Sequence, residues 1–253
     1  EAPQAYRNMI DHLLESRHYG ERWGRHWLDV VGYSDTGEID NDLMTVVKNV
    51  GVWQYRDWVI RAINADMPYD QFISMQLAGD EMIDWRTAET FTPEIRDHLI
   101  ATGFASHVQD HTDHDQYGRK ERFDVLTQIM ETFSSGILGV TMACAQCHDH
   151  KYEPFPQRDY YRLMACFMPA FNPDNWVRRN ARQLSTISPA EKATVDQKNS
   201  EIDAQVASLT EKIKALETSI SNETAPSNEP ASSEIIKLRQ QIKAIQADRQ
   251  SYG

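Results

Sequence analysis

Residues 121–140 read Glu121-Arg-Phe-Asp-Val-Leu-Thr-Gln-Ile-Met-Glu-Thr-Phe-Ser-Ser-Gly-Ile-Leu-Gly-Val140, and this stretch decides the fold class. Its apolar side chains recur every three or four residues, at Phe123, Leu126, Ile129, Met130, Phe133 and Ile137. Because an α-helix completes one turn in 3.6 residues, this spacing places them on one helical face. The stretch therefore predicts an amphipathic helix whose apolar face packs against a core.

Helical spacing also characterises much of the chain on either side of this stretch. Similar apolar stripes fall in residues 1–30, 52–65, 92–104 and 157–168. The Tyr-Gly pair at 19–20 indicates a break within the first stripe. Residues 32–50 and 106–118 are polar and indicate loops. Since no strand-rich segments alternate with the helices, we expect a mainly α fold, with one irregular helical domain over residues 1–180.

The C-terminal quarter of the chain has a different pattern. Apolar residues are spaced alternately by four and three positions, at Ile202, Val206, Leu209, Ile213, Leu216 and Ile220, and again at Ile235, Leu238, Ile242 and Ile245. This is the heptad spacing of a coiled coil. Residues 222–233 between the two runs are rich in Asn, Ser and Pro and indicate a loop. We therefore predict an antiparallel coiled-coil hairpin over residues 186–253, serving as a structural arm or as an oligomer or partner contact.

Composition and charge argue against nucleic acid as a partner and against a membrane-spanning segment. The formal net charge is −12, so nucleic acid would be repelled by the average field of the protein. No run of about 20 apolar residues is present, so we expect no membrane span. The chain opens at Glu1 and not at Met, which indicates a processed product or part of a longer protein.

The chemistry of the chain is concentrated in Cys144-Ala-Gln-Cys-His148, directly after the apolar helix. Cys-x-x-Cys-His is the attachment signature of c-type haem. Two thiols at this spacing can reach the two vinyl groups of one porphyrin, and the adjacent imidazole can bind the iron. We therefore predict covalent haem c bound through Cys144 and Cys147, with His148 as iron ligand and Lys151 as a partner for a haem propionate.

Two other interpretations of the cysteines remain open. Cys144, Cys147 and His150 also fit the spacing of a zinc site, with Cys166 as a fourth ligand. A disulfide between Cys144 and Cys147 without any cofactor is the third interpretation. In both cases the motif would be structural. Absorption spectroscopy separates haem from the other two, because only haem gives a Soret band.

The second axial ligand of the iron has several candidates. His26 lies between Trp23 and Trp27, where a buried histidine needs a bonding partner, and it is our first choice. Other candidates are His107, His111, His114, Met130, Met142, Met164 and Met168. Three histidines and three aspartates in residues 107–115 also form a candidate second metal site, although polar loops commonly carry such residues without a metal.

Several separated motifs together resemble the planctomycete cytochrome-associated family, a domain of unknown function found beside planctomycete-type cytochrome c domains. The motifs are Glu21-Arg-Trp-Gly-Arg-His-Trp-Leu-Asp29, Tyr55-Arg-Asp-Trp-Val-Ile60, Asp66-Met-Pro-Tyr-Asp-Gln-Phe72, Gln76-Leu-Ala-Gly-Asp80, Leu99-Ile-Ala-Thr-Gly-Phe104, Gly139-Val-Thr-Met-Ala-Cys-Ala-Gln-Cys-His-Asp-His-Lys-Tyr-Glu-Pro154 and Gln157-Arg-Asp-Tyr-Tyr-Arg162. The resemblance covers roughly residues 5–175. It implies no established reaction. The three histidines in residues 107–118 depart from the Glu- and Gly-rich stretch of the relatives, so the resemblance implies no role for them.

The motif and the resemblance together predict a haem-binding redox module that transfers electrons within a larger exported, periplasmic assembly. Its expected partner is a redox protein such as a cytochrome c domain. An alternative is a haem- or metal-dependent oxidoreductase acting on a small molecule. A third is a non-catalytic structural domain with zinc or a disulfide at Cys144 and Cys147, so whether the chain is an enzyme is left open at this point.

Overall fold

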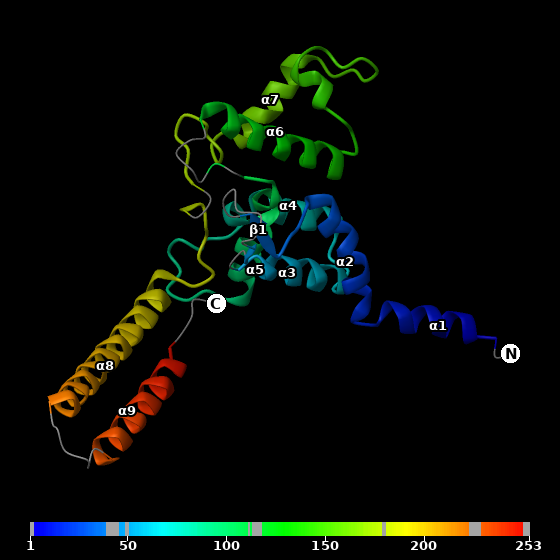
Figure 1. Cartoon of the computed structure of the whole chain (residues 1–253). Coiled ribbons are helices and arrows are strands. Elements are labelled where there is room, and N and C mark those ends of the chain that lie inside the picture. The colour runs from blue at the N-terminus through cyan, green and yellow to red at the C-terminus, as the bar shows by residue number, and fades with distance from the viewer. Residues whose placement is uncertain are drawn as a thin grey trace. The chain divides into compact units, whose positions relative to one another are not determined.

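The structure is a computed structural model that describes residues 3–38, 46–48, 51–110, 112, 118–178, 181–222 and 229–249. It is mainly helical, which confirms the predicted fold class. The chain divides into two compact units (Figure 1). The first unit comprises residues 1–85 and 92–184, and the second comprises residues 86–91 and 185–253. Segment 86–91 thus belongs to the same unit as residues 185–253, and not to the domain predicted over residues 1–180.

The first unit contains seven α-helices, two 3-10 helices and a pair of short strands within its described residues. In chain order they are α1 (Ala5–Leu14), α2 (His18–Val31), β1 (Thr36–Glu38), β2 (Val46–Lys48), α3 (Trp53–Asn64), α4 (Tyr69–Met82), α5 (Pro93–Ala101), η1 (Thr102–His107), α6 (Arg119–Gly136), η2 (Ala143–Gln146) and α7 (Gln157–Phe167). The helices predicted from periodicity in residues 52–65, 121–140 and 157–168 correspond to α3, α6 and α7.

One apolar cluster lies among α2, α3, α4, α5 and η1. Its buried members are Val31, Tyr55, Trp58, Val59, Ala62, Phe72, Met75, Ala101 and Phe104. The rings of Trp58 and Phe72 stack with centroids 5.2 Å apart, and Trp27 meets Phe72 edge to face. Removing these large side chains from water supplies the main stabilisation of this part of the unit.

Two glycines allow α2 to approach α3 closely. A Cβ at Gly20 would overlap the main-chain oxygen of Ile60 and the side chain of Asn64. A Cβ at Gly24 would instead make ordinary contacts with α3 at 3.4 Å or more. The predicted break at Tyr19-Gly20 is wrong, because α2 runs through both residues and the interruption falls at residues 15–17. Gly20 is there for helix packing and not to end a helix.

A buried polar network joins three helices across the first cluster. Trp27 Nε1 on α2 donates to Gln76 Oε1 on α4 at 2.9 Å and approaches Tyr55 Oη on α3 at 3.1 Å. Tyr55 Oη also donates to Gln76 Oε1, and Gln76 Nε2 donates to the main-chain oxygen of Phe72. Each polar side chain therefore has a partner inside the core, which avoids the cost of burying an unpaired donor.

The predicted loop over residues 32–50 contains a small antiparallel strand pair. Thr36 pairs with Lys48, and Glu38 with Val46. Gly32 ends α2 in a left-handed conformation, with φ of 70°. The predicted loop thus contains two strands, at residues 36–38 and 46–48, which were missed because three-residue strands are too short for alternation to reveal them.

A second apolar cluster lies among α6, η2 and α7 and carries the Cys-x-x-Cys-His segment. Its buried members are Leu126, Met130, Met142, Ala145, Tyr160 and Met164. Helix α6 ends at Gly136, four residues before the predicted end, and the chain then turns at Gly139, where φ is +67°. The turn allows residues 142–146 to return along α6 and bury Met142 and Ala145.

The second unit contains α8 (Pro189–Asn222) and α9 (Glu229–Ala247), which lie side by side (Figure 1). Arg239 on α9 pairs with Glu217 on α8 at 3.0 Å, and Arg249, just beyond α9, pairs with Asp203 at 2.7 Å. Ile202 and Ile213 on α8 and Ile235 on α9 are buried. Within the described segments, no helix combines the length and the hydropathy needed to cross a bilayer.

Candidate functional site

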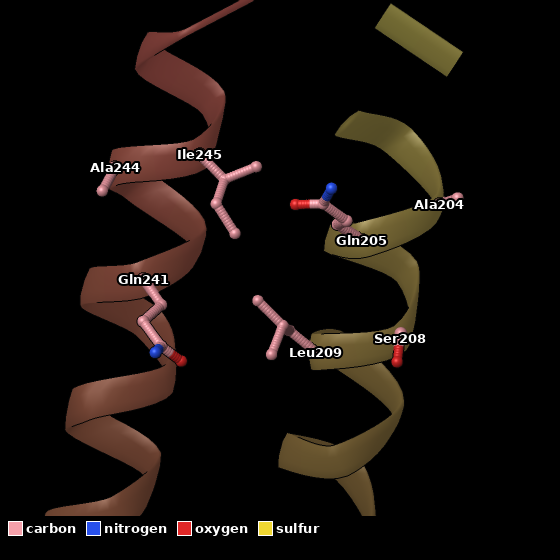
Figure 2. A pocket seen from close by; sticks show the side chains of 7 residues that line it. All are labelled: Ala204, Gln205, Ser208, Leu209, Gln241, Ala244 and Ile245. Carbon is pink, nitrogen blue, oxygen red and sulfur yellow. The ribbon is translucent and has the colours of Figure 1, made fainter. Parts of the chain in front are cut away.

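A groove between α8 and α9 is lined by uncharged side chains. Figure 2 shows Leu209 and Ile245 directed into the space between the two helices. The lining residues are Ala204, Gln205, Ser208, Leu209, Gln241, Ala244 and Ile245. None of these side chains is charged, and none is a usual metal ligand or nucleophile apart from the Ser208 hydroxyl. The Cys-x-x-Cys-His motif lies in the first unit.

The motif residues lie on one turn that begins with η2. The main-chain N–H groups of Cys147 and His148 both donate to the oxygen of Cys144, each at 3.3 Å. In such a turn residues at i, i+3 and i+4 share one face. Cys144, Cys147 and His148 are all exposed, whereas Ala145 between them is fully buried. The turn therefore presents two thiols and an imidazole together and anchors its opposite side in the second cluster.

The imidazole of His148 has a defined hydrogen-bond partner. Its Nδ1 lies 2.7 Å from the main-chain oxygen of Asp149. A carbonyl oxygen can only accept, so Nδ1 carries the proton and Nε2 of the neutral ring keeps its lone pair. Histidines that bind metals commonly have this arrangement, with one ring nitrogen donating to a carbonyl and the other facing the metal.

Gln146, the residue before Cys147, connects the turn to both neighbouring helices. Its Nε2 donates to Thr127 Oγ1 on α6 at 3.4 Å. Its main-chain oxygen accepts from Gln157 Nε2 at 3.0 Å and from Tyr161 Oη at 2.9 Å, both on α7. The motif turn is therefore held on two sides and not by its own backbone alone.

The segment after the motif forms a turn around His150. His150 Nδ1 accepts the main-chain N–H groups of Tyr152 at 3.3 Å and Glu153 at 2.9 Å. The lone pair of Nδ1 is thus used, and Nε2 of the neutral ring carries the proton. In this arrangement His150 offers no lone pair to a metal, in contrast to His148.

Lys151, the predicted propionate partner, lies at the surface. Its Nζ is 5.3 Å from the ring centre of Tyr152, which is 81% exposed. A lysine in this position keeps its charge accessible to an anionic group bound near the motif. Tyr152 adds a flat apolar surface beside that charge.

The four ligands of the zinc interpretation do not gather in this structure. All three cysteines of the chain are exposed free thiols, and Cys166 lies on α7 with its Sγ 3.7 Å from the oxygen of Arg162. Over the described ranges, no group of three or more His, Cys, Asp or Glu side chains is arranged to hold a metal ion.

His26, the first choice for the second iron ligand, lies on an exposed face of α2. Its ring centre is 5.5 Å from that of Trp23, which is itself 52% exposed. The premise that His26 is buried among tryptophans was therefore wrong, because Trp23 and His26 share the outer face of α2. Its role as a ligand of iron stays a prediction.

The described members of the His- and Asp-rich loop take part in packing. The ring of His107 lies 4.7 Å from that of Tyr55 and 5.2 Å from that of Tyr33. Asp110 forms a buried ion pair with Arg182, whose guanidinium lies over the rings of Phe171 and Trp176. His111, Asp113, His114 and Asp115 lie outside the described residues.

Tyr160 is a buried neighbour of the motif that was not predicted from the sequence. It is fully buried against Ala145, and burial raises the pKa of its hydroxyl. Tyr160 and Met164 are four residues apart and share one face of α7. This helical spacing is the signal that could have identified Tyr160 as buried. Gln146 and Asp149 gave no such signal, because their contacts with His148 and α7 involve main-chain atoms.

A comparison with protein families finds one family model that matches most of the chain. The model of PSCyt2, described as a protein of unknown function (DUF1549), matches residues 1–172. The chain belongs to the PSCyt2 family. The PSCyt2 match includes the motif turn and α7 and ends before α8 begins. No curated protein and no solved structure matches the chain.

Proposed function

We propose that this PSCyt2 chain attaches one haem c through Cys144 and Cys147, uses His148 as an iron ligand, and acts as an electron-transfer module. The observation that carries the proposal is the motif turn, which presents two free thiols and a histidine whose Nε2 lone pair is available. The side chains needed for attachment are thus exposed together on one turn.

Each thiol would add across one vinyl group of the porphyrin. The sulfur would bond to the vinyl carbon next to the ring, and the thiol hydrogen would end on the other vinyl carbon. The addition consumes no oxidant or reductant. Once bound, haem supplies an iron that exchanges one electron between its ferrous and ferric states. His148 would hold the iron on one side, and Lys151 would pair with a propionate.

The exposure of the turn supports electron exchange with another protein. Cys144, Cys147 and His148 all lie at the surface, so a haem attached there would have an accessible edge. We propose a cytochrome c domain as the partner, in an exported, periplasmic assembly of the planctomycete type. Support comes from the resemblance of the motifs, from the net charge of −12 and from the chemistry of the cofactor.

The second unit supports assembly rather than redox chemistry in this proposal. Buried Ile202, Ile213 and Ile235 belong to the heptad runs, and two ion pairs connect the flanks of α8 and α9. These features favour an antiparallel coiled-coil hairpin. We propose that it is an arm that contacts a partner or another copy of the chain.

The test is production of the chain in a host with an active haem-attachment system, followed by absorption spectra and intact mass. We expect a Soret band with sharp α and β bands and a mass increase of one haem that survives denaturation. Cys144→Ser and Cys147→Ser should each remove one thioether bond, and the double variant should lose covalent haem completely. Cys166→Ser is the matched control, since Cys166 is also an exposed free thiol.

Other outcomes separate the alternatives. A protein that carries no haem, but does carry zinc or a Cys144–Cys147 disulfide, would contradict the proposal and support a structural motif. A high-spin haem spectrum that changes on adding cyanide or peroxide would contradict electron transfer. It would favour an oxidoreductase activity at the same haem.

A further inference from the structure

The start of α7 depends on a residue from the motif segment. Pro156 occupies the position before the helix, and no side chain there caps it. Instead, Asp149 Oδ1 accepts the main-chain N–H of Gln157, the first residue of α7, at 2.8 Å. A carboxylate at a helix N-terminus satisfies a free N–H and interacts favourably with the helix dipole. Asp149 therefore fixes α7 from eight residues away.

The same residue also orients the histidine of the motif. The main-chain oxygen of Asp149 accepts the Nδ1 proton of His148 at 2.7 Å. One residue thus joins the imidazole to α7, through its carbonyl on one side and its carboxylate on the other. Tyr161 and Gln157 make a parallel connection from α7 to the oxygen of Gln146.

We infer that Asp149 is the positioning residue for His148: its carboxylate anchors the main chain on α7 so that its carbonyl keeps the proton on Nδ1 and leaves Nε2 free for iron. The inference rests on the proposed function, because that proposal is what identifies haem iron as the group bound by His148. It differs from that proposal because it concerns the chain before any cofactor binds, and the tautomer of His148 can be measured directly there.

The experiment compares Asp149→Ala, Asp149→Asn and the control Asp159→Ala in the full chain. Asn keeps an oxygen that can accept from Gln157, whereas Ala does not. Asp159 is another carboxylate in the first turn of α7, but it pairs with Arg162 at 3.0 Å. The control therefore removes a charge from the same helix end and leaves the hydrogen bonds of Asp149 to Gln157 and His148 in place.

The first measurement uses long-range ¹H–¹⁵N spectra of the apoprotein at alkaline pH. Wild type and Asp149→Asn should show His148 protonated at Nδ1, and Asp149→Ala should show a mixture of the two tautomers. Asp159→Ala should match wild type. If His148 in the wild type carries its proton on Nε2, or if the Ala variant retains a pure Nδ1–H form, the inference is overturned.

The second measurement is the covalent haem content and reduction potential after production with the attachment system. Asp149→Ala should reduce haem content by up to about tenfold, because the carbonyl that accepts from His148 stays but is no longer anchored on α7, and disturbing such a contact lies at the low end of the loss that follows removal of an outer-shell partner. The haem that remains should show an altered potential, and Asp149→Asn should restore both. If the wild type carries no haem, the proposed function is contradicted. If the wild type carries haem and Asp149→Ala has the same haem content and reduction potential, only the inference is contradicted.

Discussion

Single residues decide how closely the helices of the first unit approach. Gly20 lies where α2 meets α3, and its N–H donates to Asn64 Oδ1 at 2.8 Å. Asn64 Nδ2 in turn donates to the oxygen of Arg17 at 2.9 Å. A side chain at residue 20 would overlap the main chain of α3 and the Asn64 side chain that makes these hydrogen bonds.

We expect Gly20→Ala to lower the free energy of unfolding by about 1–3 kcal/mol, because overpacking must push α2 away from Ile60 and Asn64. Gly24→Ala is the matched control in the same helix, facing the same neighbour with room for a methyl group. It should be neutral or stabilising by up to about 1 kcal/mol, since Ala favours helix over Gly. Urea unfolding followed by tryptophan fluorescence checks both, and equal shifts would contradict the packing argument.

At the site, the sequence indicated the candidate haem residues, whose role in binding haem stays a prediction, but not the contacts around them. Spacing alone selected Cys144, Cys147 and His148 as candidates, because two thiols must match the distance between two vinyl groups for haem to attach. The contacts of the Gln146 and Asp149 main-chain oxygens could not be predicted, because main-chain oxygens have no residue-specific signature. The cap that the Asp149 carboxylate forms was missed because it acts on α7 from eight residues away. The premise about His26 was wrong for a different reason: Trp23 shares the outer face of α2 with His26 and is itself 52% exposed, so tryptophans nearby in the sequence do not imply burial.

Among the elements, α8 has the most complete N-terminal cap. Ser188 Oγ accepts the N–H of Glu191 at 3.1 Å, and Glu191 Oε2 accepts the N–H of Ser188 at 2.8 Å. This reciprocal pair is a capping box, with Pro189 as the first helical residue. Ser188 Oγ also donates to the oxygen of Glu89, so the cap ties segment 86–91 to the start of α8.

We expect Ser188→Ala to destabilise the beginning of α8 by about 1 kcal/mol or somewhat more, because it loses the cap and the bond to Glu89 together. Amide hydrogen exchange in the first turn of α8 should become faster. Ser200→Ala makes the same chemical change at an exposed position inside α8 and should leave that turn unchanged. Equal exchange in the two variants would mean that Ser188 does not cap the helix.

The elements that the sequence predicted are those with a long apolar period. Helices α3, α6 and α7 each repeat apolar residues over three turns or more, and their predicted bounds lie within a few residues of the observed ones. The strands β1 and β2 were missed because each has three residues. The false break at Gly20 arose because glycine weakens a helix in isolation, whereas here tertiary packing outweighs its propensity.

On the scale of the whole molecule, the two units differ in their aromatic content. All six tryptophans, at residues 23, 27, 53, 58, 85 and 176, lie in the first unit. The second unit consists mainly of α8 and α9, so it contributes strongly to far-ultraviolet circular dichroism. Tryptophan fluorescence therefore reports on the first unit, and its unfolding can be compared with that of the helices in the second unit.

We expect Ile213→Ala to shift only the part of the circular-dichroism transition that belongs to α8 and α9. Ile213 is 8% exposed, and truncating such a residue typically costs about 2–5 kcal/mol. The tryptophan transition should stay where it is, because two compact units with separate cores can unfold separately. Ile236→Ala is the matched control, since Ile236 is 58% exposed and its truncation should change the free energy of unfolding by less than about 0.5 kcal/mol. A common shift of both transitions in Ile213→Ala would show instead that the units unfold as one, and the stability of the motif turn would then depend on α8 and α9.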